Sequence, residues 1–370
     1  MSHLHLCVFG GQYGSEGKGC VSEFLMKENR HHGDRFREWT VIGENAPNSG
    51  HTCSAGSVRS LPAASFFANR VMLGPDAVID IDILKHDLAT IQAWRATQFS
   101  DELPGLPGGR LEVHIHPHAA WLKPHHREME ANSKSVTAIS STGSGSGAAR
   151  FEKYFSRTPD SVIQSAIVEY PNIFAPYDVR IQPLKAWPIL ASMALDGSCL
   201  FECSQGFMLD TNFGLFPHVT SRSTSPRVAV ERNGFGYENW SYCAAIRTYP
   251  IRTGGPSGPT AGKEISFLEL GIPNEIATVT KRIRRIFEFS VDDLEYMTQL
   301  VAPDKLFITH ADYLSDWSQK NGFASLSTVD WRAITGAWWK TTVADQSPWI
   351  DETFQDNVWF SARAGQFEKL

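Results

Sequence analysis

The N-terminal segment constrains the fold most, because an apolar run, a glycine-rich turn and a helical pattern follow one another directly. The run LHLCVF at 4–9 ends at Gly10 and Gly11, which is typical of a buried parallel strand. The next apolar residues recur at helical spacing, at Val21, Phe24 and Leu25. Gly33 can end that helix. The turn therefore lies at a helix N-terminus, where backbone N–H groups and the helix dipole attract anions.

The rest of the chain repeats this alternation of strand and helix. Residues 80–95 predict a second helix, and further apolar runs predict buried strands at 110–116, 197–203 and 304–310. Alternating elements favour an α/β fold with a mostly parallel central sheet and helices on both faces. Glycine- and serine-rich stretches interrupt the pattern at 140–150 and 252–264. We therefore expect residues 1–370 to form a single large domain with loop insertions.

Composition excludes several functional classes. The formal net charge is −6, so neither nucleic acid nor an anionic membrane is an expected partner. No apolar run approaches the length of a membrane span, and the N-terminus lacks a signal-peptide pattern. The six cysteines show no C-x-x-C spacing, which is typical of free thiols in a reducing compartment. The sequence thus predicts a cytoplasmic protein whose partners are small molecules.

The opening turn, GGQYGSEGKG at 10–19, departs from two common phosphate-binding motifs. A Walker A loop needs a glycine at the position of Gln12 and a serine or threonine at the position of Gly19. The dinucleotide fingerprint G-x-G-x-x-G also needs a glycine in place of Gln12. A P-loop kinase or GTPase switch is therefore disfavoured. The spacing alone does not exclude a tight strand-to-helix turn that binds no ligand.

Taken whole, the same turn closely resembles the G-x-Q-W-G-D-E-G-K-G signature of adenylosuccinate synthetases, which attach aspartate to the 6-position of a purine. Other segments that resemble family motifs follow in family order: NSGHT at 48–52, STGSGSG at 141–147, FECSQGFMLD at 201–210, FPHVTSRST at 216–224, TVTKRIRR at 278–285 and ITHAD at 308–312. The resemblance spans most of the chain and weakens near the C-terminus. It also implies a homodimer.

The resemblance implies a reaction in two steps. The γ-phosphate of a nucleoside triphosphate moves to the purine O6, and the amino group of aspartate then displaces that phosphate. Lys18 would neutralise phosphate charge, and His51 would act as general acid on the phosphoryl side. Gly50 would offer its carbonyl to Mg²⁺. The residues implied to hold the triphosphate are Gly14, Glu16, Gly17, Lys18, Gly19, Gly50, His51 and Thr52.

The other subsites are implied in the same way. The residues that resemble those holding the nucleoside monophosphate are Ser15, Asn48, Thr142, Gln205, Thr220 and Arg157. The aspartate site would consist of Thr278, Thr280, Arg282 and Arg284, because guanidinium groups match carboxylates. His310 and Asp312 stand where the family contacts the triphosphate base. Ser144 replaces the arginine of the family's phosphate loop, so Arg150 or Arg157, from this chain or a partner subunit, would take over its role.

Ser15 is the departure that bears on the substrate. The family has an aspartate there, which removes the purine N1 proton and helps to bind magnesium, so Ser15 and Gly50 are the candidate metal contacts. A serine hydroxyl cannot replace a carboxylate base, because the pKa of a hydroxyl lies far above neutral. An aspartate facing N1–H would also clamp a 2-amino group in the ground state, whereas the smaller serine leaves room for one. This substitution resembles phage-encoded members of the family that use dGMP.

The sequence is therefore interpreted as a ligase that joins L-aspartate to the 6-position of dGMP through a 6-phosphoryl intermediate. It would consume ATP or dATP, because His310 replaces the lysine that normally stacks on the guanine of GTP. The product would be N6-succino-2-amino-2′-deoxyadenylate, a precursor for genomes containing 2-aminoadenine. Two alternatives stay open: an ordinary synthetase using IMP and GTP, and a catalytically silent nucleotide-binding protein. The N1 proton acceptor is open among Glu16, a bound water and the substrate's own phosphate.

Two histidine clusters lie outside these motifs. The pattern of His114, His116 and His118 is compatible with a metal site, but it is interpreted as the histidine-bearing edge of a strand. His125 and His126 are interpreted as surface residues at a helix end.

Overall fold

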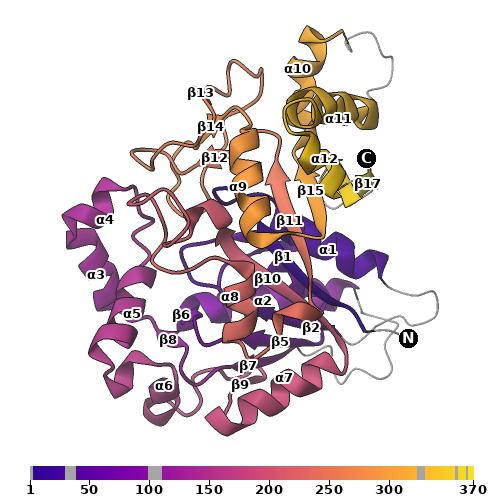
Figure 1. The fold of residues 1–370 in the computed structure, drawn as a ribbon. Coiled ribbons are helices and arrows are strands. Elements are labelled where there is room, and N and C mark those ends of the chain that lie inside the picture. Colours follow the sequence, from indigo (N-terminus) through magenta and orange to yellow (C-terminus); the bar gives the residue numbers. More distant parts are fainter. Residues whose placement is uncertain (1–2, 30–38, 99–110, 323–329, 355–356, 364–365) are drawn as a thin grey trace.

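The computed structural model describes residues 3–29, 39–98, 111–322, 330–354, 357–363 and 366–370. Its centre is a ten-stranded sheet in the order β17-β16-β15-β11-β1-β10-β2-β5-β7-β9 (Figure 1). The strands are β1 (His5–Gly10), β2 (Trp39–Gly43), β5 (Arg70–Leu73), β7 (Glu112–Ile115), β9 (Val179–Ile181), β10 (Ser198–Gly206), β11 (Ser241–Arg247), β15 (Lys305–Thr309), β16 (Val358–Arg363) and β17 (Gln366–Lys369). All neighbouring strands run parallel except β16 and β17. The mostly parallel sheet expected from the sequence is confirmed.

Helices connect these strands. They are α1 (Lys18–Glu28), α2 (Ile81–Gln98), α3 (Pro124–Asn132), α4 (Lys134–Ala138), α5 (Ser146–Phe151), α6 (Gln164–Glu169), α7 (Trp187–Leu195), α8 (Pro226–Arg232), α9 (Val291–Val301), α10 (Ser315–Lys320), α11 (Trp331–Trp339) and α12 (Pro348–Phe354). The predicted strands appear as β1, β7, β10 and β15, and the two predicted helices as α1 and α2. Gly33 and position 110 lie outside the described residues. No helix within the described ranges has the length and apolarity needed to span a bilayer.

Three small sheets accompany the central sheet in the described residues. A three-stranded antiparallel sheet contains β12 (Ile251–Arg252), β14 (Arg285–Phe287) and β13 (Glu264–Ile265). A hairpin contains β3 (His51–Cys53) and β4 (Gly56–Val58), and β6 (Val78–Ile79) pairs with β8 (Ala120–Trp121). In Figure 1 the β12–β14 sheet lies at one end of the molecule, near α9, and helices α3 to α6 lie together at one side.

Two hydrophobic cores lie on the two faces of the sheet. Along β1, Leu6 and Val8 belong to one core and Cys7 and Phe9 to the other, as the alternation of side chains along a strand requires. The first core includes residues of α1 and α2, and the second includes residues of α7, α8, α9, α11 and α12. Helices therefore cover both faces, as the sequence predicts.

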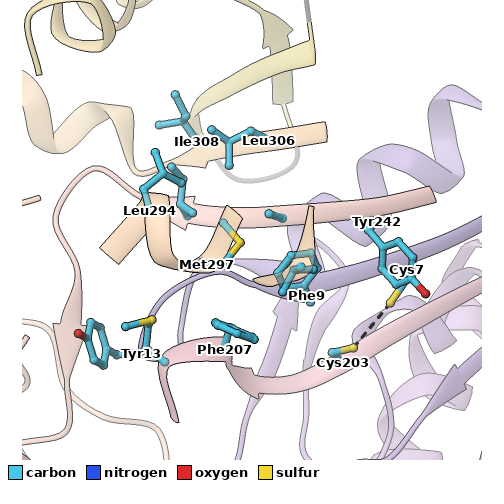
Figure 2. Packing of buried hydrophobic residues seen from close by; sticks show 14 of the residues in the cluster. Cys7, Phe9, Tyr13, Cys203, Phe207, Tyr242, Leu294, Met297, Leu306 and Ile308 are labelled. Carbon is cyan, nitrogen blue, oxygen red and sulfur yellow. Dashed lines mark hydrogen bonds between the residues drawn. The ribbon is translucent and has the colours of Figure 1, made fainter. Parts of the chain in front are cut away.

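The second core packs directly behind the opening turn. Figure 2 shows Phe9 among large apolar side chains, with Met297 of α9 near it. The sulfur atoms of Cys7 and Cys203 lie 3.8 Å apart in the same view. This separation is far longer than the bond of about 2.05 Å in a disulfide, so both cysteines are thiols, as the sequence predicts.

The parallel arrangement brings several loops to one edge of the sheet. Strands β1, β10, β11 and β15 are neighbours in the order β15-β11-β1-β10 and point the same way. Their carboxyl ends, at Gly10, Gly206, Arg247 and Thr309, therefore lie at a common edge. In open α/β sheets this is the edge where ligands bind.

Candidate active site

A cavity of about 480 Å³ opens at this edge, within the usual size range of small-molecule sites. It collects most of the residues that the family resemblance singled out. Those that line it are Gly14, Ser15, Gly17, Lys18, Gly19, Asn48, Gly50, His51, Thr52, Thr142, Gln205, Thr278, Thr280, Arg284, His310 and Asp312. Five others do not line it: Glu16, Arg150, Arg157, Thr220 and Arg282.

Some of the residues that line the cavity have a strained backbone conformation. Three non-glycine residues of the lining have left-handed backbone angles, namely Ser15 (φ 58°), Gln205 (φ 72°) and His310 (φ 56°). Such a conformation costs on the order of 1–3 kcal/mol for each residue and is concentrated at functional sites. These three residues lie at the carboxyl ends of different strands, so the strain converges on one place. We take this convergence as independent support for a functional cavity.

The opening turn leads directly into α1. Gly14 and Gly17 adopt φ of 99° and 76°, which glycine does without steric cost. Gly19 is required for a different reason, because a Cβ atom there would lie 2.3 Å from the carbonyl oxygen of Thr52. The N-terminus of α1 is thereby held against β3. Lys18 begins this helix and lines the cavity. Only 7% of its surface is exposed.

Glu16 lies beneath the turn. Its side chain is completely buried, and Oε1 accepts hydrogen bonds from the backbone N–H groups of Gln12 (3.2 Å) and Gly14 (2.7 Å). Oε2 accepts from Lys18 Nζ at 2.8 Å. The side chain of Glu16 therefore shapes the turn, and the expected contact of Glu16 with the triphosphate, through its backbone N–H group, stays a prediction. The signature motif could not reveal this, because it fixes the order of residues and leaves open the direction of each side chain.

His51 is held by a carboxylate that sequence reasoning missed. His51 Nδ1 lies 2.7 Å from Glu202 Oε1, and Glu202 also accepts from the backbone N–H groups of Ala63 (2.9 Å) and Ala64 (3.1 Å). Burial alone would raise the pKa of Glu202, but His51 and these N–H groups lower it overall. Glu202 is therefore ionised, His51 Nδ1 carries a proton, and Nε2 lies toward Ser49 Oγ, 3.3 Å away. The available signal was a glutamate within the apolar run of β10, since charged residues are seldom buried without a partner.

A half-buried carboxylate, Glu275, organises the expected aspartate site. Arg247, Arg284 and Tyr313 all donate to Glu275, with distances of 3.2 Å from Arg284 Nη1 and 2.7 Å from the Tyr313 hydroxyl. Arg247 and these partners outweigh burial and lower the pKa of Glu275 to about 2. Arg247 also donates to the backbone oxygen of Ser15 at 3.2 Å. Arg247 and Glu275 line the cavity, and neither was singled out from the sequence.

Only one of the two arginines expected to bind aspartate lies at the cavity. Arg284 lines the cavity, whereas the side chain of Arg282 is exposed outside it. Lys281 has a φ of 56°, so the chain turns between the two threonines and the two arginines. This turn, which spacing in the sequence did not predict, places Arg282 away from the cavity.

The glycine- and serine-rich loop before α5 contributes one of the expected residues to the cavity. Thr142 lines the cavity, but the amides at the start of α5 are already occupied. Glu130 of α3 accepts hydrogen bonds from the N–H groups of Gly145 (2.8 Å), Gly147 (2.7 Å) and Ala148 (3.2 Å). These three amides are therefore not free to bind an anion, and Thr142 is the residue of the loop that lines the cavity.

The remaining candidates for the monophosphate site lie elsewhere. Arg150 is buried and its Nε lies 3.5 Å from Asp76 Oδ1, in a network that also contains Arg222. Arg157 is exposed at the end of a short π-helix, Glu152–Ser156, and does not reach the cavity of its own chain. Thr220 lies outside the lining, and its N–H donates to Leu209. Long-range packing, which motif order does not encode, decides all three positions.

The histidine clusters do not enter the cavity. Within the described residues the group with metal-ligating geometry is His125, His126 and Glu152, and the three histidines of 114–118 are not part of it. His126 is fully buried, which corrects the expectation of a surface position. Its Nδ1 accepts the N–H of Lys123 at 2.9 Å, so Nε2 bears the proton in the neutral ring and donates to Glu152. This tautomer leaves no lone pair on either nitrogen for a metal.

Comparison with known proteins agrees with the geometry. The adenylosuccinate synthetase family model matches residues 176–320. The N6-succino-2-amino-2′-deoxyadenylate synthase of Vibrio phage phiVC8 is 31% identical over 320 residues, covering 82% of this chain and 84% of that protein. The enzyme of the same name from Salmonella phage PMBT28 is 28% identical over 83% of this chain and 85% of its own length. The adenylosuccinate synthetase of Thermotoga maritima is 25% identical over 85% of this chain and 82% of its own.

A solved structure has the same fold. The succinoaminodeoxyadenylate synthetase of cyanophage S-2L, solved bound to dGMP and to dATP as an energy donor, superposes with a TM-score of 0.75. It is 23% identical, and the match covers 100% of this chain and 96% of that one. The identity and coverage shared with the Vibrio phage enzyme, together with the ordered motifs around one cavity, lead to one conclusion. The chain belongs to the adenylosuccinate synthetase family.

Proposed function

We propose that this chain joins L-aspartate to C6 of dGMP at the expense of ATP or dATP. The products would be N6-succino-2-amino-2′-deoxyadenylate, the nucleoside diphosphate and phosphate. The observation that carries the proposal is Ser15, which lines the cavity at the position of the family's aspartate. The names of the phage relatives and the ligands of the cyanophage structure support it. The alternative pair, IMP and GTP, would call for an aspartate at position 15 and a lysine at position 310.

The first step is phosphoryl transfer. O6 of dGMP attacks the γ-phosphorus, the bond to the β–γ bridging oxygen breaks, and N1 loses its proton. Lys18 and the N-terminus of α1 would stabilise charge on the transferring group. His51, held through Nδ1 by Glu202, would donate from Nε2 to a phosphoryl oxygen. In the second step the aspartate nitrogen attacks C6 and the phosphate leaves.

The position of Glu16 narrows the choice of N1 proton acceptor. Both of its oxygens already accept hydrogen bonds, and Lys18 neutralises its charge. Glu275 does line the cavity, but a carboxylate whose pKa is about 2 is a weak base. We therefore assign the proton to a bound water or to a phosphate oxygen of the substrates.

Magnesium is the proposed cofactor. Gly50 and Ser15 line the cavity. Their carbonyl and hydroxyl oxygens would suit this hard cation, which binds oxygen ligands and usually retains several waters. Substrate phosphates would complete its coordination. When bound, Mg²⁺ supplies positive charge to the triphosphate.

The aspartate site is assigned to Thr278, Thr280 and Arg284, all of which line the cavity. The hydroxyl of Thr280 is buried and makes no hydrogen bond within the described part of the chain, so it is available to a carboxylate. Arg282 would contact aspartate only after a movement of the turn at Lys281.

We further propose that the enzyme is a homodimer in which Arg157 serves the neighbouring cavity. Phe151 and Phe155 stack on one another with ring centroids 4.9 Å apart, yet they are 54% and 70% exposed. Exposed aromatic pairs of this kind are typical of interaction surfaces. Arg157 lies two positions after Phe155 and does not line the cavity of its own chain.

Residues 1–370 would act as one catalytic domain in the cytoplasm of a phage-infected host.

The test is a product analysis. Purified protein is supplied with aspartate, Mg²⁺, either dGMP or IMP, and either ATP, dATP or GTP. The proposal predicts aspartate-dependent phosphate release with dGMP and a nucleotide heavier by the succinyl group. Efficient turnover of IMP with no use of dGMP would overturn it.

A further inference from the structure

We propose that Ser49 is a further catalytic residue, whose hydroxyl passes a proton from His51 Nε2 to the transferring phosphoryl group. This inference rests on the proposed function, in which His51 is the general acid of the phosphoryl-transfer step. It adds the route that the proton takes. The family motif that NSGHT resembles reads N-A-G-H-T, so the family has an alanine where this chain has Ser49. The resemblance therefore assigns no role to this hydroxyl.

Ser49, His51 and Glu202 form a connected series of hydroxyl, imidazole and carboxylate. Glu202 Oε1 lies 2.7 Å from His51 Nδ1, and Ser49 Oγ lies 3.3 Å from His51 Nε2. Because Nδ1 donates to the carboxylate, Nε2 is the nitrogen that is left to exchange a proton. The same order of groups moves a proton along the Ser-His-Asp triads of hydrolases. Here the series ends at the cavity, because Ser49 lines it.

The hydroxyl of Ser49 is better placed than the ring of His51 to meet a substrate. The side chain of His51 is only 2% exposed. Ser49 is half-buried and precedes Gly50, which is exposed at the cavity wall. Within the described residues, the hydrogen-bond partner of His51 Nε2 is Ser49 Oγ. A proton that leaves Nε2 therefore meets Ser49 first.

The surroundings of Ser49 Oγ allow its hydrogen to point in two directions. Oγ lies 3.3 Å from the backbone oxygen of Ala46 as well as 3.3 Å from His51 Nε2. A carbonyl oxygen only accepts, whereas a hydroxyl donates one hydrogen and accepts others. When Nε2–H donates to Oγ, the Ser49 hydrogen is directed to Ala46. Once Nε2 has lost its proton, the Ser49 hydrogen is directed to Nε2, so the two residues stay hydrogen-bonded before and after the step.

The backbone holds Ser49 in this place. The N–H group of Ser49 donates to the Ala46 oxygen at 3.2 Å, which closes a tight turn. Ala46 is buried at one end of that turn, and His51 pairs with Val58 in the hairpin of β3 and β4. The hydroxyl and the imidazole are therefore positioned before a nucleotide arrives, and such positioning of reacting groups lowers the barrier of the step.

The proton transfer consists of two coupled movements. The proton on His51 Nε2 moves to Ser49 Oγ, and the hydrogen of the Ser49 hydroxyl moves to a non-bridging oxygen of the phosphoryl group. One Oγ–H bond breaks as another forms, so Ser49 ends as a neutral hydroxyl. His51 loses one proton and keeps Nδ1–H, and the phosphoryl group gains one proton. The charged phosphoryl oxygen would draw the Ser49 hydrogen from Ala46, because hydrogen bonds to charged acceptors are roughly twice as strong as those to neutral ones.

The first part of the test removes and restores the hydroxyl. Ser49→Ala installs the residue that the family motif has. We expect its kcat with dGMP, aspartate and ATP or dATP to fall at least about tenfold, through the loss of one catalytic hydrogen bond. Ser49→Thr carries a hydroxyl again and should recover part of the lost rate. A melting curve for each variant shows whether it is folded.

The second part distinguishes a relay from a structural role. A relay moves two protons in one step, so single-turnover rates in mixtures of H₂O and D₂O should give a curved proton inventory for the wild type. Ser49→Ala should give a straight one. A double-mutant cycle of Ser49→Ala with Glu202→Gln should be non-additive, because both residues act on the same proton. If Ser49 only filled space, the two losses would multiply and the inventories would have the same shape.

The outcomes separate this inference from the proposed function. If the wild-type protein makes no product from dGMP, aspartate and any triphosphate, the proposed function fails. If it makes product but Ser49→Ala keeps the wild-type kcat or the wild-type proton inventory, the function stands and the relay is overturned. The same holds if Ser49→Thr is no faster than Ser49→Ala. A phosphoryl group on Ser49 in the intact mass of the protein after turnover would also overturn the relay, because Oγ would then have attacked phosphorus.

Discussion

Replacing Glu202 by glutamine removes the negative charge that contacts His51 Nδ1, and the side chain keeps nearly the same shape. The two oxygens of Glu202 accept from three donors: His51 Nδ1 at 2.7 Å, Ala63 N at 2.9 Å and Ala64 N at 3.1 Å. A glutamine has one oxygen and one NH₂ group. In either orientation its NH₂ group therefore faces a donor, and the contact to His51 is no longer between charged partners.

The size of the effect follows from this geometry. A hydrogen bond to a charged group contributes about 1.5–3 kcal/mol, and about 1.4 kcal/mol corresponds to a factor of ten. The hydrogen bond that holds His51 should thus weaken by a factor of about ten to a hundred in Glu202→Gln. We expect kcat to fall by that factor and the KM values to change little, because Glu202 does not line the cavity.

A matched control separates catalysis from stability. Asp87 is also buried, and its Oδ2 accepts from the N–H groups of Arg59 (2.9 Å), Ser60 (2.6 Å) and Leu61 (3.1 Å). It does not line the cavity. Asp87→Asn should lower the melting temperature, because buried donors lose their acceptor at about 1–3 kcal/mol, without lowering kcat.

The assay is steady-state phosphate release across the acidic and neutral range, with thermal melting in parallel. The reasoning is refuted if Glu202→Gln melts earlier, as Asp87→Asn does, but keeps the wild-type kcat. Glu202 would then only anchor residues 63–64, and the role assigned to His51 would be wrong.

Three further predictions concern other parts of the site. Gly19→Ala should cost about 1–3 kcal/mol of unfolding free energy and weaken triphosphate binding, because the new Cβ would push α1 off β3; equal denaturation midpoints for variant and wild type would contradict this. The folded-state pKa of Glu275 lies near 2, below its usual 4.5, so this group stabilises the fold above about pH 4.5 and loses about 3 kcal/mol as the pH falls toward 2. Urea melts of Glu275→Gln should therefore show a flatter decline than wild type over that acidic range, and parallel curves would refute the assignment. Phe155→Asp should give a monomer in sedimentation velocity, and an unchanged wild-type dimer would place the interface elsewhere.

The local parts of the site could be predicted from the sequence. Lys18 and His51 belong to short contiguous motifs, GGQYGSEGKG and NSGHT, and both line the cavity as the motif order implied. The parallel sheet was predictable for a similar reason, because apolar runs and glycine punctuation are properties of neighbouring residues. Contiguous patterns therefore identified the strands, the turn and the residues that follow them.

The parts that were missed depend on contacts between distant segments. Glu202 and His51 are 151 positions apart in the chain, and no spacing rule joins them. Glu130 reaches the N-terminus of α5 through the packing of α3, which a loop motif does not contain. Glu16 and Arg282 each follow a residue in the left-handed conformation, Ser15 and Lys281, and such residues are rarely evident without coordinates.

The central claim is that the small hydroxyl of Ser15 adapts this family's cavity to a purine with a 2-amino group. The most direct measurement is the ratio of kcat/KM for dGMP to that for dIMP, which differ only by that amino group, in the wild-type protein and in Ser15→Asp. The account predicts a ratio above one for the wild type and a large fall, toward dIMP, in the variant. A wild-type enzyme that prefers dIMP, or a ratio that Ser15→Asp leaves unchanged, would contradict it.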